Sequence, residues 1–171
     1  PEELDEDFFK SDIVVFGGTA LGFSAKSYKN IIGANDRIRV ALIGVNGRGT
    51  SMATTIASQK NVEVSTVCDV DERAIPKAIK AVMDVKQINT PKAERDCRNV
   101  MADKLIDAIY IATPDHWHSP LTIMGCQSGK HVYVEKPLSH NPAEGEMAIA
   151  AARKYDRVVQ MGAQRRSAPI L

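Results

Sequence analysis

A chain of 171 residues is long enough for one domain with a sizeable hydrophobic core. Its 22 basic and 21 acidic residues nearly cancel, and it has no basic run interleaved with aromatic residues, so nucleic acid is not an expected partner. The three cysteines are odd in number and widely spaced, which argues against a disulfide framework and a structural zinc site and favours buried thiols; they are Cys68, Cys97 and Cys126.

The first 33 residues read as a leader-like N-terminal extension. An acidic segment, residues 1–10, precedes an apolar segment, residues 13–25, that is too short to span a bilayer. The apolar segment is closest to the central part of an export signal, although such signals carry positive charge before it. A glycine-weakened helix leading into the domain is the equal alternative. A cytoplasmic and a periplasmic location therefore both stay open, and no membrane partner is expected.

The prediction of the fold starts from residues 38–58. A β-branched apolar run over 38–43 breaks into a glycine-rich turn over 44–49, and a helix-compatible segment follows from about 50 to 58. This is the strand, turn and helix context of a dinucleotide-binding loop, in which a helix N-terminus attracts the pyrophosphate. Asn46 stands where the middle glycine of G-x-G-x-x-G belongs, and it tolerates a left-handed backbone. A surface turn that binds nothing is the alternative interpretation.

Asp69 favours the dinucleotide interpretation. It ends the second strand-like run, residues 62–68, and follows Gly49 by 20 residues. An acid at this spacing accepts hydrogen bonds from the adenosine ribose. The two runs should be parallel strands joined by a right-handed crossover.

The rest of the chain continues to alternate helices and strands. Helices are expected over 71–83, 96–104, 121–127 and 142–155, and strands over 107–112, 131–134 and 158–161. Any strand within 87–95 is short. The pattern predicts an α/β fold, a doubly wound parallel sheet of the Rossmann type over residues 34–162.

Polar residues follow two of the later strands, where open α/β sheets bind ligands. Lys136, preceded by Glu135, has an ammonium group that can hold a hydroxyl or carbonyl oxygen beside a cofactor and help to move its proton. A surface ion pair is the alternative. His116 and His118 do not complete a metal site, so no metal is expected. The sequence shows no serine or cysteine paired with a base, so it gives no sign of a nucleophile for hydrolysis by covalent catalysis.

Four segments resemble the Gfo/Idh/MocA oxidoreductases, and they cover residues 40–49, 111–118, 129–138 and 160–167. The most specific of them contains Glu135-Lys136-Pro137. Members of this family are NAD(P)-dependent enzymes that act mostly on sugars and cyclitols, with a Rossmann domain and a C-terminal α/β domain. The resemblance, over about residues 34–171, implies hydride transfer between NAD(P) and a sugar or cyclitol hydroxyl.

The resemblance also implies a role for each matching residue. The pyrophosphate loop comprises Gly44, Asn46, Gly47, Arg48 and Gly49. The ribose ligand is Asp69. The wall near the nicotinamide ribose comprises Thr113, Pro114 and His118. Glu135 lies at the cofactor site, and Lys136 is the catalytic lysine, which contacts substrate near the carbon that exchanges hydride.

Two finer expectations concern Asp69 and Lys136. As the ribose ligand, Asp69 accepts from a 2′-hydroxyl and repels a 2′-phosphate, which favours NAD over NADP. The proline after Lys136 predicts a cis peptide bond at that position, an expectation that the family resemblance motivates.

Residues 163–171 are interpreted as the start of a C-terminal domain that this chain lacks. In the family that domain carries the catalytic histidine and much of the sugar-binding surface. Two functions stay open. One is the cofactor half of an NAD-dependent sugar or cyclitol oxidoreductase, or of a redox-assisted glycosidase of this family. The other is a free-standing NAD-binding module without turnover. Without a covering domain the exposed apolar surface would favour association, so a homo-oligomer is also left open.

Overall fold

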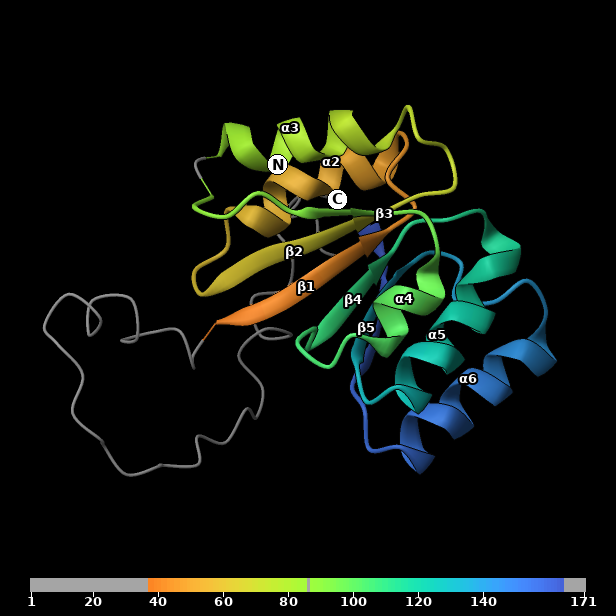
Figure 1. Ribbon diagram of the computed structural model, residues 1–171. Coiled ribbons are helices and arrows are strands. Elements are labelled where there is room, and N and C mark those ends of the chain that lie inside the picture. Colours follow the sequence, from red (N-terminus) through yellow and green to blue (C-terminus); the bar gives the residue numbers. More distant parts are fainter. Residues whose placement is uncertain (1–36, 86, 165–171) are drawn as a thin grey trace, which may run out of the picture.

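The computed structural model describes residues 37–85 and 87–164, which form a parallel sheet between two layers of helices (Figure 1). The strands are β1 (Ile38–Ile43), β2 (Val62–Cys68), β3 (Lys92–Glu94), β4 (Ala108–Ile111), β5 (His131–Glu135) and β6 (Val159–Gly162). They pair in the order β3-β2-β1-β4-β5-β6, and every pair is parallel. Chain order reverses between β1 and β4, as in a doubly wound sheet, so the predicted fold class is confirmed.

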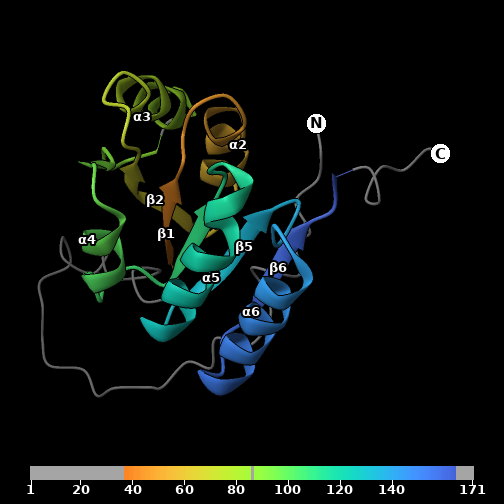
Figure 2. The same ribbon diagram turned by 90° about the vertical axis from the view of Figure 1, so that its right-hand side faces the viewer.

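Helices cover both faces of the sheet. They are α2 (Arg48–Ala57), α3 (Ile75–Asp84), α4 (Cys97–Ala102), α5 (His118–Gln127) and α6 (Pro142–Lys154), with one 3₁₀ turn, η1 (Asp115–Trp117), before α5. Helices α2 and α3 lie on one face, and α4, α5 and α6 lie on the other (Figure 2). Right-handed crossovers from parallel strands produce this two-sided cover.

The strands for which bounds were predicted agree with them to within one residue, and β3 is the short strand within 87–95, whereas three helices begin elsewhere. Helix α2 begins two residues early, at Arg48, and α5 begins three residues early, at His118. Pro120 was expected in a loop, but proline is tolerated in the first turn of a helix because the N–H it lacks has no partner there. Helix α3 begins only at Ile75, because the residues before it form a turn in which Ala74 N donates to Asp71 O.

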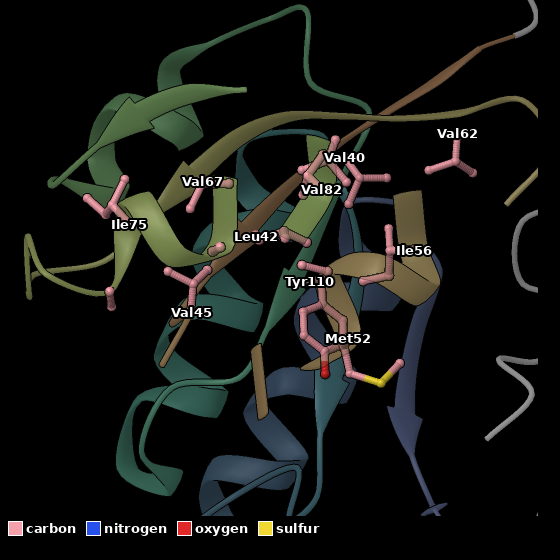
Figure 3. Packing of buried hydrophobic residues seen from close by; sticks show 14 of the residues in the cluster. Val40, Leu42, Val45, Met52, Ile56, Val62, Val67, Ile75, Val82 and Tyr110 are labelled. Atoms are coloured by element: carbon pink, nitrogen blue, oxygen red, sulfur yellow. The ribbon is translucent and has the colours of Figure 1, made fainter. Parts of the chain in front are cut away.

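Two hydrophobic layers hold the helices to the sheet. Alternate residues of each central strand face opposite sides, so Val40 and Leu42 pack with α2 and α3, while Ala41 and Ile43 belong to the layer on the other face. Figure 3 shows the first layer, with Met52 and Ile56 of α2 and Tyr110 of β4 among its members. The expectation of buried thiols holds for Cys68 and Cys126, whereas Cys97 is only partly buried because it opens the short helix α4.

A buried lysine ties together the loops that precede β4 and β5. The side chain of Lys130 is 1% exposed, and its Nζ donates to the carbonyl oxygens of Asp103 at 2.5 Å and Ile106 at 3.0 Å. Burial lowers the pKa of this ammonium group. The two carbonyl groups replace part of the hydration that the ammonium loses.

His131 gives the edge of the sheet a contact that depends on pH. Its Nδ1 accepts a hydrogen bond from Val158 N at 3.1 Å, and burial lowers its pKa below the ordinary value of 6.5, with Arg157 acting in the same direction. The unfolded chain therefore takes up a proton first as the pH falls. The contribution of His131 to stability is complete above pH 6.5 and is lost as the pH falls through the folded-state pKa.

We expect the free energy of unfolding to fall between about pH 7 and about pH 5 more steeply in the wild type than in His131→Asn, whose amide oxygen accepts from Val158 without titrating. Urea unfolding at each pH measures both slopes. Equal slopes in the two proteins would contradict the assignment to His131.

Candidate functional site at the carboxyl edge of the sheet

The turn between β1 and α2 packs closely against the backbone that follows β4, and its two ends pack against each other. Gly44 has φ +81°, and a Cβ on it would lie 2.7 Å from Thr113 N at the end of β4. A Cβ on Gly49 would lie 2.0 Å from the carbonyl oxygen of Gly44. No side chain fits at either position, so the start of α2 is held directly over the end of β1.

The N-terminus of α2 is open to an anion. The residue at its N-cap, Gly47, has no side chain to cap the helix, and its first turn contains no acidic residue. The exposed Asn46 serves the turn itself: Gly47 N donates to its Oδ1 at 3.1 Å, and Gly49 N to its carbonyl oxygen at 3.2 Å. A ten-residue helix with an uncapped N-terminus presents N–H groups and the positive end of its dipole. These features suit a pyrophosphate.

Asp69, directly after β2, is held against this turn. Its Oδ2 accepts from Val45 N at 2.7 Å, and its Oδ1 accepts from Asp71 N at 2.9 Å. Each carboxylate oxygen has a second lone pair, so Asp69 can also accept from the hydroxyl groups of a ribose. Two residues further on, the Asp71 carboxylate pairs with Arg73 Nε at 2.9 Å, and the hydrogen bonds from Arg73 lower the pKa of Asp71 to about 2.

Glu135, the last residue of β5, is 4% exposed and accepts hydrogen bonds from three other segments. Arg48 Nε of α2 donates to its Oε1 at 2.9 Å, and the Tyr110 hydroxyl of β4 donates to the same oxygen at 2.7 Å. Gln164 Nε2 donates to Oε2 at 3.2 Å. Burial raises the pKa of Tyr110, as does its bond to Glu135, so the phenol stays a donor. Glu135 thus joins the glycine turn to the ends of β4, β5 and β6.

His118 joins the segments that follow β4 and β5. It is 1% exposed, with Nδ1 2.6 Å from the carbonyl oxygen of Pro137 and Nε2 2.8 Å from that of Thr113. The next residue, Ser119, donates from Oγ to the carbonyl oxygen of Leu138 at 3.1 Å. Both ring nitrogens of His118 face carbonyl oxygens of the backbone, so this side chain holds the segments after β4 and β5 together.

Two polar side chains at this edge are available to a ligand. Thr113 Oγ1 is buried and has no hydrogen-bond partner among the residues that the structure describes. The side chain of Lys136 is exposed, and the Lys136–Pro137 peptide bond is cis, as the sequence predicts. Pro114 is exposed beside Thr113.

The structure therefore brings the predicted site residues to one edge of the sheet, formed by the carboxyl ends of β1, β2, β4 and β5 (Figure 1). Sequence reasoning missed two partners of Glu135. Tyr110 looks like a core residue of its strand, and nothing local marks its hydroxyl. Gln164 lies in the fourth segment that resembles the family, which was a usable signal.

Two kinds of feature are absent from the described residues. Within 37–85 and 87–164, no group of three or more His, Cys, Asp or Glu side chains could hold a metal ion. The helices in the same ranges are too short or too polar to cross a membrane.

Comparison with known proteins gives a consistent set of relatives. The profile of the Gfo/Idh/MocA family, described as an oxidoreductase family with an NAD-binding Rossmann fold, matches residues 38–163. A protein of Saccharopolyspora erythraea named glycosyl hydrolase family 109 protein is 36% identical over 107 residues, which are 61% of this chain and 23% of the relative. The chain thus spans about a quarter of the length of the curated relatives that it matches.

Solved structures agree in fold. A probable dehydrogenase from Thermotoga maritima superposes with a TM-score of 0.68 at 27% identity, covering 75% of this chain and 37% of that one. GenD2 from gentamicin A biosynthesis, solved in complex with NAD, gives a TM-score of 0.67 at 25% identity, covering 74% and 34%.

The contact between Gly49 and Gly44 gives a direct test of the turn. We expect Gly49→Ala to lower the free energy of unfolding by about 1–3 kcal/mol, because the new methyl group must displace backbone. Ser51→Ala, at an exposed position of the same helix, should change it by less than about 0.5 kcal/mol. Urea unfolding of the two variants measures the difference. A Gly49→Ala protein as stable as Ser51→Ala would contradict the described packing.

Proposed function

The chain belongs to the Gfo/Idh/MocA oxidoreductase family and contains its NAD-binding Rossmann domain, and from this premise we propose that it binds NAD at the carboxyl edge of the sheet. The observation that carries the proposal is the uncapped N-terminus of α2 beside the Asp69 carboxylate, which bonds to the same turn at Val45 N. The pyrophosphate lies at the turn formed by residues 44–49, and the adenosine ribose lies at Asp69. When bound, NAD supplies a hydride acceptor.

The nicotinamide half of NAD extends past the end of β4. Thr113 and Pro114 form the wall beside its ribose, and the buried Thr113 Oγ1, which has no partner within residues 37–85 and 87–164, would turn toward the ribose to bond to it. His118 holds this wall through the Thr113 carbonyl oxygen and contributes no free ring nitrogen to the ligand. Glu135 lies below the cofactor as the partner of Arg48.

Lys136 is the residue that we assign to the substrate. Its exposed ammonium group, at the carboxyl end of β5, can hold the hydroxyl of a sugar or cyclitol and help to move its proton as hydride leaves the neighbouring carbon. The whole protein in this reading is an NAD-dependent sugar or cyclitol oxidoreductase. Family membership and the GenD2 complex with NAD support it.

One observation favours a second candidate. The relative from Saccharopolyspora erythraea carries the name glycosyl hydrolase family 109 protein, so the same cofactor domain suits an NAD-dependent glycosidase. In that case oxidation and reduction of the sugar would assist cleavage of a glycosidic bond. A non-catalytic NAD-binding module is the third reading, and it differs from both in having no substrate for Lys136.

We expect the chain to prefer NAD to NADP by about tenfold or more. With the ribose at Asp69 as proposed, a 2′-phosphate would be repelled by the Asp69 and Asp71 carboxylates, and Arg73 is engaged with Asp71. Calorimetric titration of both dinucleotides measures the ratio of their Kd values. The ratio should shrink in Asp69→Asn and stay unchanged in Asp84→Asn, which alters an exposed carboxylate of α3. Equal or tighter NADP binding by the wild type would refute the assignment.

We further expect this 171-residue chain to bind NAD without sustained hydride transfer, because it spans only about a quarter of its curated relatives. Transfer needs the two carbons held about 3–3.5 Å apart with water excluded. The test mixes the chain with NAD and a panel of sugars and cyclitols and follows absorbance of the reduced nicotinamide. Lys136→Ala should leave NAD affinity within about threefold, since Lys136 faces the substrate. Sustained turnover that Lys136→Ala abolishes would show that these residues suffice for catalysis.

A further inference from the structure

The geometry points to a mechanical link between the pyrophosphate loop and Lys136, made by the ion pair of Arg48 and Glu135. In this inference, which rests on the proposed NAD site, Arg48 and Glu135 are positioning residues: occupation of the loop shifts Arg48, and Arg48 in turn shifts the end of β5 that carries Lys136.

The pair crosses the edge of the sheet at its central position. Arg48 is the first residue of α2, which follows β1, and Glu135 is the last residue of β5. Because β4 lies between β1 and β5, the arginine side chain reaches across the end of β4 to bring Nε 2.9 Å from the Glu135 carboxylate. A dinucleotide bound between the ends of β1 and β4 would therefore lie against this pair.

The glutamate end of the pair is buried and has further donors. Its side chain is 6% exposed and also accepts from Tyr110 of β4 and from Gln164 after β6. Weakening one bond of a buried charge network leaves the carboxylate poorly solvated, so we expect Glu135 to readjust when Arg48 moves. The arginine end, 34% exposed, is the part that can respond to a ligand at the turn.

The position of Lys136 depends on the residues before and after it. Glu135 precedes it and is held from the α2 face, while the carbonyl oxygen of Pro137, which follows it, lies 2.6 Å from His118 Nδ1 of α5. The backbone from which the exposed Lys136 side chain extends has a defined position only while Glu135 and Pro137 are both held. Removing Arg48 takes away one of the side-chain donors that hold the Glu135 carboxylate.

Arg48 also separates two negative groups. Without it, the Glu135 carboxylate would face a pyrophosphate at the turn with no cation between them, and the two would repel. The arginine therefore has two roles. It shields the pyrophosphate from the Glu135 carboxylate, and it passes a change at the pyrophosphate loop on to Lys136.

Adenosine diphosphate tests the link, because it carries the pyrophosphate and adenosine of NAD and has no nicotinamide group to touch Lys136. In ¹H–¹⁵N spectra of the chain, saturating adenosine diphosphate should move the amide signal of Lys136. In Arg48→Met we expect the Kd to rise about tenfold and the Lys136 signal to stay in place at saturation. Arg48→Lys keeps the charge and should restore much of the shift, whereas a purely structural role would change stability without changing this response.

Two further variants sharpen the result. Arg73→Met, which removes an exposed arginine near the adenosine end, should keep the Lys136 response. Glu135→Gln, which keeps the shape of the side chain, should weaken the response even if Arg48→Met fails to fold.

An unchanged Lys136 response in saturated Arg48→Met or in Glu135→Gln would overturn the link while leaving the NAD site standing. Failure of the wild-type chain to bind either NAD or adenosine diphosphate would overturn the proposed function and the link together.

Discussion

The contact between the backbone of Gly49 and the carbonyl oxygen of Gly44 is the constraint on which the arrangement of the carboxyl edge depends. It allows α2 to start directly above the end of β1, because neither residue has a side chain to keep the two apart. From that position the turn exposes Val45 N to Asp69, and the first residue of α2, Arg48, reaches Glu135. A longer or bulkier turn would move all of these groups at once.

The carboxylates at this edge of the sheet are each compensated by hydrogen-bond donors or by an arginine. Asp69, Asp71 and Glu135 would together repel an anionic dinucleotide if their carboxylates were free. Each instead accepts bonds from backbone N–H groups or from an arginine. The field that would meet an anion at this edge then comes mainly from the open N-terminus of α2. In the proposed NAD site these acids could therefore bind the ribose and hold the strand ends without repelling the pyrophosphate.

The sequence was informative where the physical signal is local. Apolar runs located every strand except β3 to within one residue, and the spacing from Gly49 to Asp69 identified an acid that does contact the turn. The start of α5 was predicted too late, because a proline in a first turn reads the same as a proline in a loop. The pairing of Glu135 with Arg48 could not be predicted from the sequence, because Arg48 is 87 residues away in the chain and only the sheet order brings the two together.

Strand β5 lies between a buried lysine and an exposed lysine. Lys130, just before it, is 1% exposed and held by two carbonyl oxygens, while Lys136, just after it, is exposed to solvent. An acylating reagent that reacts with free amines would reach Lys136 in the folded protein and Lys130 only after the strand has come away from its neighbours. The acylation of the two lysines, read in one short proteolytic fragment, would therefore report separately on the accessibility of the carboxyl edge and on the unfolding of the sheet.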